Sequence, residues 1–206
     1  MNNNHSYITT LPANRNLWVK LNDYAVLVKM KLSLVVVITS VLGYFIVANG
    51  SGTWSDLALL ISGGFLVTGA ANALNQVLEK EFDILMTRTS GRPVANGRMK
   101  SSEAVMFAGL ACLTGISLLA MFNPVTALLG MLSLIIYAFV YTPLKRYSTL
   151  AVAVGAVPGA LPVMIGATAF EGSISLLAVC LFVIQFLWQF PHFWSIGFLG
   201  YDDYQK

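Results

Sequence analysis

The chain has 206 residues, of which 57% are hydrophobic and only 10% are charged. Soluble domains usually contain about 25% charged residues, so this composition excludes an ordinary water-soluble protein. The formal net charge is +3. The basic residues are confined to alternate connectors between apolar segments, as described below. We therefore expect no nucleic-acid partner.

Apolar runs predict helices that cross a membrane, because each run has about 20 residues, the length that spans a bilayer. Six such spans are predicted, at 26–48, 57–78, 102–122, 125–141, 149–169 and 174–199. The predicted fold class is all-α, a polytopic transmembrane helical bundle. The polar N-terminal stretch has no cleavable signal pattern, so we expect residues 1–25 to form a cytoplasmic lead to a transmembrane domain over 26–206.

Lys and Arg are sorted between the connectors of these spans. The connectors after the first, third and fifth spans contain neither residue type, and all 12 basic residues lie in the other set. The positive-inside rule places the N-terminus and the basic loops in the cytoplasm. The chain is thus expected to be integral to a lipid bilayer, the bacterial inner membrane or its equivalent.

Four polar side chains line one helix face at the end of the second span. Asn72, Asn75, Glu79 and Asp83 follow at steps of three, four and four residues, and such steps keep side chains on one face. Ionisable groups near a membrane are costly and usually face a cavity or a partner. These oxygen ligands suit Mg²⁺ that is shared with substrate phosphates.

Arginines follow this face in a loop that Gly and Pro residues break. Arg88, Arg92 and Arg98 can therefore fold back over the helix end, where guanidinium groups would pair with phosphate oxygens. Together the two groups predict a Mg²⁺–diphosphate site whose lipid tail lies among the helices. The alternative is a charged loop that only sets topology, although topology does not require an aligned polar face.

Two later loops carry further candidates. Tyr141, Lys145 and Arg146 lie at the end of the fourth span and predict a second cationic clamp on diphosphate, or simply a positively charged membrane anchor. In the last span His192 is unusual, and its alternatives are a functional or a hydrogen-bonded structural role. Asp202 and Asp203 follow on the same side and could share Mg²⁺ with the first acidic cluster.

Three sequence blocks resemble a known family. NQVLEKEFD (75–83) is similar to the N-D-x-x-D-x-x-x-D motif of the intramembrane prenyltransferase superfamily, with Gln76 in place of the first Asp. The blocks DILMTRTSGRPVANGRM (83–99), YTPLKR (141–146) and PHFWSIGFLGYDDYQK (191–206) resemble the heme O synthase family, the protoheme IX farnesyltransferases. The resemblance runs from about residue 25 to the end of the chain.

The resemblance implies transfer of a farnesyl group from farnesyl diphosphate to a vinyl group of heme B, giving heme O and diphosphate with Mg²⁺. It also implies nine transmembrane helices, so we expect this six-span chain to be a C-terminally truncated domain. The implied metal ligands are Asn75, Glu79, Asp83, Asp202 and Asp203. The implied substrate-binding residues are Asn72, Arg88, Arg92, Tyr141, Lys145, Arg146, His192, Asp202 and Asp203. The implied catalytic residues are Asn75, Glu79, Asp83 and Lys145.

Two other functions remain open from the sequence. A related membrane prenyltransferase would act on a quinone or chlorophyll precursor, and the Arg-Thr-x-x-Arg-Pro run (88–93) weighs against it. A cation transporter would need polar residues along one path through the bilayer. Polar residues here gather instead at the ends of the spans.

Overall fold

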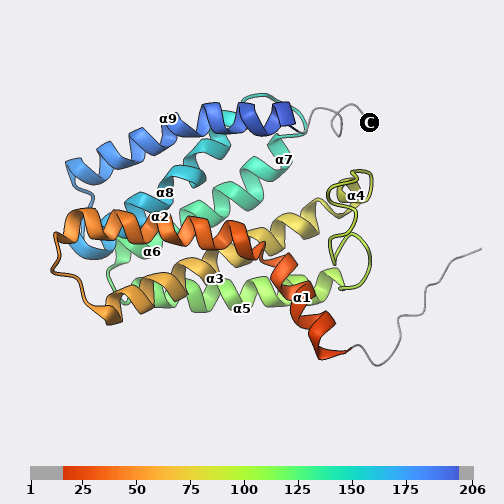
Figure 1. Cartoon of the computed structure of the whole chain (residues 1–206), viewed down its shortest axis with the longest axis horizontal. Coiled ribbons are helices and arrows are strands. Elements are labelled where there is room, and N and C mark those ends of the chain that lie inside the picture. The colour runs from red at the N-terminus through yellow and green to blue at the C-terminus, as the bar shows by residue number, and fades with distance from the viewer. Residues whose placement is uncertain (1–15, 200–206) are drawn as a thin grey trace, which may run out of the picture.

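The computed structural model describes residues 16–199, and within this range every regular element is a helix. Figure 1 shows the helices running back and forth as a bundle. Their bounds are α1 Leu17–Leu27, α2 Met30–Ala48, α3 Trp54–Leu78, α4 Lys80–Asp83, α5 Ser101–Ala120, α6 Pro124–Ile135, η1 Ile136–Tyr141, α7 Thr142–Leu144, α8 Ala151–Glu171 and α9 Leu176–Leu199.

Six helical segments within residues 16–199 are long and apolar enough to cross a membrane, which confirms the six predicted spans. They are α2, α3, α5, the continuous segment α6–η1–α7, α8 and α9. Side chains cap the start of two of these segments. Thr53 accepts a hydrogen bond from the Asp56 backbone at the start of α3, and Asn123 accepts one from the Thr126 backbone at the start of α6. The chain is therefore an integral membrane protein.

The span α8 is the most deeply buried of the six. It packs against α2, α6 and α9, while α3 packs along α5. Gly43 of α2 and Gly166 of α8 let the two backbones touch: an added Cβ would overlap the Val163 or the Ser40 carbonyl oxygen. Small residues at helix contacts allow such close approach in membranes.

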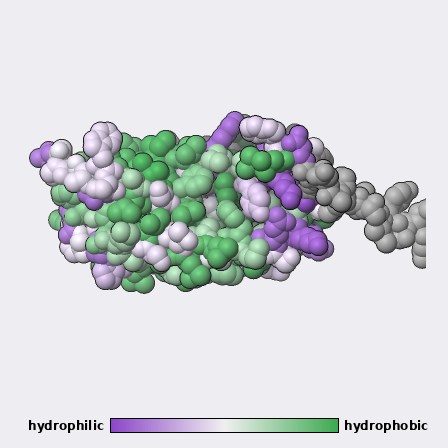
Figure 2. Space-filling view, turned by 90° about the horizontal axis from the view of Figure 1, so that it is seen from below, coloured by the Kyte–Doolittle hydropathy of each residue, from purple (hydrophilic) through white to green (hydrophobic). Residues whose placement is uncertain are grey.

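Polar groups gather at one end of the bundle, which we call the charged end. It contains α4, the segment 84–100 and residues 145–150 (Figure 1). Figure 2 shows a hydrophobic middle and strongly hydrophilic residues at this end. The connectors at the opposite end, 49–53, 121–123 and 172–175, have no Lys or Arg, so the structure groups the basic loops as the sequence predicts.

The first predicted span, 26–48, is not one continuous helix. The helix α1 ends at Leu27 and α2 begins at Met30, because Lys29 between them adopts a left-handed conformation with φ 48° and ψ 58°. Such a break exposes the last carbonyl groups of α1. Side chains of α3 satisfy them: the Gln76 amide donates to Val26 and Leu27, and the Asn72 amide donates to Val28.

Candidate active site

The three predicted metal ligands of this region lie at the junction of α3 and α4. Asn75, Glu79 and Asp83 are all buried, although α3 ends at Leu78 and α4 adds only one further turn. Glu79 forms the junction with φ −102° and ψ 4°, and this bend keeps the three side chains together. Glu81, which is out of phase with them, is exposed.

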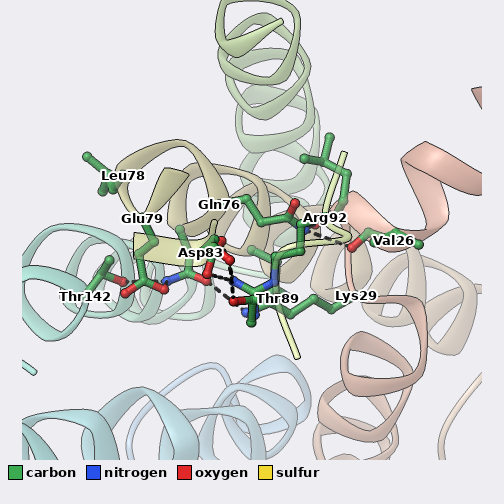
Figure 3. Close-up of polar contacts among 12 residues, drawn as sticks. Val26, Lys29, Gln76, Leu78, Glu79, Asp83, Thr89, Arg92 and Thr142 are labelled. Atoms are coloured by element: carbon green, nitrogen blue, oxygen red, sulfur yellow. Dashed lines mark hydrogen bonds and ion pairs between the residues drawn. The ribbon is translucent and has the colours of Figure 1, made fainter. Parts of the chain in front are cut away.

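Each of the three side chains contacts a basic residue from a different segment. Lys29 Nζ donates to Asn75 Oδ1 at 2.9 Å. Lys145 Nζ pairs with Glu79 Oε1 at 2.5 Å. Arg92 Nη1 donates to both Asp83 oxygens, at 2.8 and 2.7 Å (Figure 3). The structure thus brings Arg92 and Lys145 to the acidic face, as predicted, and adds Lys29.

Hydrogen bonds fix the direction of the Asn75 amide. Its Nδ2 donates to Glu79 Oε2 at 2.8 Å and to Thr142 Oγ1 at 3.1 Å, so Oδ1 is left to accept from Lys29. Thr142 in turn donates to the Tyr137 carbonyl at 2.8 Å. These contacts tie the end of α3 to the end of the fourth span.

The wide turn η1 positions the residues from the fourth span. Pro143 has no N–H and its ring conflicts with the carbonyl four residues earlier, and the chain here adopts a π-helical turn over Ile136–Tyr141. Such turns are frequent at functional sites. The turn directs the Tyr137 hydroxyl to Lys29 Nζ, at 3.2 Å, and to Asn72 Oδ1, at 3.3 Å.

Asn72 and Gln76 belong to a neighbouring contact rather than to the acidic face. Both are buried, and their amides hold the α1–α2 break. The Asn72 amide also lies 3.2 Å from Ser33 Oγ. Asn72 therefore lies apart from Asn75, Glu79 and Asp83. It stabilises the backbone next to Lys29 through its hydrogen bond to the Val28 carbonyl.

The basic residues predicted to bind diphosphate do not all reach the acidic face. Arg146 stacks on the Phe82 ring at 4.0 Å and donates to the carbonyl of Leu78, the last residue of α3. Arg98 pairs with buried Asp23 of α1 at 2.9 Å and donates to the Gly91 carbonyl, which ties the loop to α1. Arg88 is exposed.

Aromatic rings connect Lys145 to α9. The Tyr141 ring lies 5.8 Å from Lys145 Nζ and 5.9 Å from the Phe193 ring. His192 is exposed beside Phe193, with the two rings 6.1 Å apart. Asp202 and Asp203, the predicted second acidic pair, lie outside the described residues.

Lys29 is the site residue that the sequence reasoning missed. Burial lowers the pKa of its ammonium to about 7, and the positive charges of Arg92 and Lys145 lower this pKa further while Glu79 and Asp83 oppose the shift. In the sequence, Lys29 is one of the 12 basic residues that follow the positive-inside rule. Its signal was its place inside a predicted span, where an ionisable residue is by default a candidate for function.

The donor chemistry of the acidic face fits Mg²⁺. Asn75, Glu79 and Asp83 offer hard oxygen atoms, and such partial oxygen sets bind Mg²⁺ together with substrate phosphates or water. Residues 16–199 contain no group of three His, Cys, Asp or Glu side chains that could hold a metal ion. The amide oxygen of Asn75 would therefore be the third donor in this part of the chain.

Comparison with known proteins decides the family. The sequence pattern of the UbiA prenyltransferase family matches residues 36–206. The chain belongs to this family. It is 46% identical over 186 residues to the protoheme IX farnesyltransferase of Flavobacterium johnsoniae and 42% identical over 203 residues to that of Flavobacterium psychrophilum.

The chain spans only part of these UbiA-family relatives. The alignments cover 89% and 98% of this chain but 62% and 67% of the two relatives. Two solved structures share the UbiA fold. One is described as a digeranylgeranylglyceryl phosphate synthase, with a TM-score of 0.74 and 21% identity over 82% of this chain and 59% of that one.

The second solved structure is a UbiA homologue from Archaeoglobus fulgidus bound to GPP and Mg²⁺. Its TM-score is 0.68, with 15% identity over 82% of this chain and 62% of that one. At such identities the likeness concerns the fold. It confirms that the six-span helical bundle of this chain is the UbiA arrangement.

Proposed function

We propose that this protein transfers a farnesyl group from farnesyl diphosphate to a vinyl group of heme B, giving heme O and diphosphate. The observation that carries the proposal is the 46% and 42% identity to two proteins named protoheme IX farnesyltransferase. The site geometry supports it, since three buried oxygen ligands and two of the predicted basic residues meet at the charged end.

In this proposal Asn75, Glu79 and Asp83 hold Mg²⁺ on the diphosphate. The bound metal ion would offset negative charge on the leaving diphosphate. Arg92 and Lys145 would donate to the diphosphate oxygens, because charge-assisted hydrogen bonds strengthen as negative charge develops there. Arg88, which is exposed nearby in sequence, would approach the same oxygens from the loop.

The reaction needs water as a third reactant, in addition to farnesyl diphosphate and heme B. The bond between farnesyl C1 and the diphosphate oxygen breaks, and its electron pair leaves with diphosphate. The π electrons of the heme vinyl group form the new carbon–carbon bond. Water then adds to the remaining cationic carbon and loses a proton, which leaves a hydroxyl group. The apolar bundle limits earlier attack by water on the farnesyl cation.

The neighbouring residues would complete the substrate site. Tyr141 and Phe193, whose rings are 5.9 Å apart, offer an aromatic surface for the reacting allylic group. We assign His192 a contact with heme, and Asp202 and Asp203 a second metal contact. The N-terminus and the charged end would face the cytoplasm of a bacterial inner membrane, following the positive-inside rule.

A choice between acceptors tests the proposal. Membranes carrying the protein would be incubated with farnesyl diphosphate, Mg²⁺, heme B and an aromatic quinone precursor in one reaction. Mass analysis of the pigments and quinones should find a heme that has gained farnesyl and hydroxyl groups. A prenylated quinone precursor with unmodified heme would contradict the proposed acceptor.

A further inference from the structure

Within residues 16–199, each of the three proposed metal ligands, Asn75, Glu79 and Asp83, already has a basic side chain in contact with it. Lys29 Nζ lies 2.9 Å from Asn75 Oδ1, and Lys145 Nζ lies 2.5 Å from Glu79 Oε1. Arg92 Nη1 lies 2.7 Å from Asp83 Oδ2. The ligands lie along the junction of α3 and α4, whereas the cations come from three separate segments: the α1–α2 break, the end of α7 and the loop 84–100.

These cations use the same oxygen atoms that a metal ion would need. Lys29 contacts Asn75 Oδ1, and hydrogen bonds to Glu79 and Thr142 already occupy the other end of that amide. Arg92 covers both oxygens of Asp83. A metal ion can therefore reach these ligands only if the basic side chains move to other acceptors.

The charge balance of the cluster decides which ligand can cause that movement. When Lys29 is protonated, three cations, Lys29, Arg92 and Lys145, surround two carboxylates, Glu79 and Asp83, and the cluster then has one positive charge in excess. A divalent cation alone would add to this excess and leave the displaced side chains without acceptors. A metal–diphosphate complex brings negative charge and phosphate oxygens that accept from Lys and Arg.

The backbone holds Lys29 in place for this exchange. Its left-handed conformation marks the α1–α2 break, and the Asn72 and Gln76 amides clamp the carbonyl groups on the N-terminal side of that break. Only its side chain needs to turn, from Asn75 towards a diphosphate beside it. The Tyr137 hydroxyl, 3.2 Å from Nζ, accepts a hydrogen bond from Lys29 at the start of that movement.

We propose that Lys29 is a diphosphate-binding residue that occupies the Asn75 oxygen until the metal–diphosphate complex arrives, and that Lys145 and Arg92 exchange partners in the same step. Mg²⁺ and diphosphate then bind cooperatively, and each binds weakly without the other. The inference rests on the proposed function only for the presence of a metal–diphosphate site, and it is independent of the acceptor.

Binding measurements on the purified protein in detergent test this exchange. Calorimetric titrations would use Mg²⁺ alone, inorganic diphosphate with EDTA, and the preformed Mg²⁺–diphosphate complex. We expect the wild-type protein to bind the complex on the order of tenfold more tightly than either component. Equal affinity for Mg²⁺ alone and for the complex would overturn the inference.

The variant Lys29→Met gives opposite changes for the two components. It removes the excess positive charge and frees Asn75 Oδ1, so Mg²⁺ alone should bind on the order of tenfold more tightly, while diphosphate in EDTA should bind more weakly by a similar factor. Lys31→Met is the matched control, because Lys31 is exposed on α2; it should leave both affinities unchanged.

The outcomes separate this inference from the proposed function. If Lys29→Met weakens Mg²⁺ and diphosphate alike, or changes neither, Lys29 acts only in the structure and the exchange is wrong, although the metal–diphosphate site stands. If the wild-type protein does not bind the Mg²⁺–diphosphate complex at all, the site and the exchange are both wrong.

Discussion

At the scale of single residues, position on the helix face separates side chains that look alike in sequence. Asp83 and Glu81 are two residues apart, yet Asp83 is buried in a contact with Arg92 and Glu81 is exposed. Asn72 and Asn75 are both buried, but one holds the α1–α2 break and the other contacts Lys29. These pairs allow tests with matched controls.

Asp83→Asn should lower prenyl transfer by at least about 100-fold, because the amide keeps the shape of the carboxylate but loses the charge needed for metal and for Arg92. Release of diphosphate from farnesyl diphosphate would measure the change. Glu81→Gln makes the same chemical change on the exposed face and should retain activity. Similar losses in both variants would show that the acidic stretch acts only through its total charge.

Asn72→Ala should lower the free energy of unfolding by about 2 kcal/mol, because the Val28 carbonyl and the Tyr137 hydroxyl lose a buried partner. Thermal unfolding in detergent would report the loss. Asn96→Ala, at an exposed position in the loop, serves as the control. Unchanged stability in Asn72→Ala would mean that the amide does not hold the break.

At the scale of helices, the lengths of the apolar runs were enough to predict every end of the six spans to within about four residues. The α1–α2 break was not predictable in this way, since its carbonyl groups are satisfied by Asn72 and Gln76, more than 40 residues further along the chain. The turn η1 was missed for a similar reason. Proline usually interrupts a helix, but the contacts of Thr142 with Asn75 of α3 and with the Tyr137 carbonyl let the helix continue through a wider turn.

Gly166→Ala should destabilise the bundle by about 2 kcal/mol, because the new methyl group would overlap the Ser40 carbonyl and push α2 away from α8. Gly109→Ala is the matched control in the middle of α5, where nothing lies within 4 Å of an added Cβ. It should be neutral or stabilising by less than about 1 kcal/mol. Equal melting temperatures for the two variants would contradict the close α2–α8 contact.

At the scale of the whole molecule, charge and apolar surface are separated along the bundle axis (Figure 2). The sequence predicted the shared end of the basic loops and the folding of loop arginines back over the end of the acidic helix face. It could not show that Arg98 and Arg146 bind Asp23 and the Leu78 carbonyl instead, because those partners depend on how the loops pack against α1 and α3. Arg92, Arg98 and Arg146, which are all loop arginines, thus have different partners in the structure.

The joint yield of both products tests the central claim most directly. Membranes carrying the protein would receive heme B and farnesyl diphosphate, with EDTA or with excess Mg²⁺, and heme O and diphosphate would be measured in the same samples. We predict equal amounts of the two products with Mg²⁺ and neither with EDTA. Heme O formation that persists in EDTA, or diphosphate release without farnesylated heme, would contradict a Mg²⁺–diphosphate site that serves farnesyl transfer to heme.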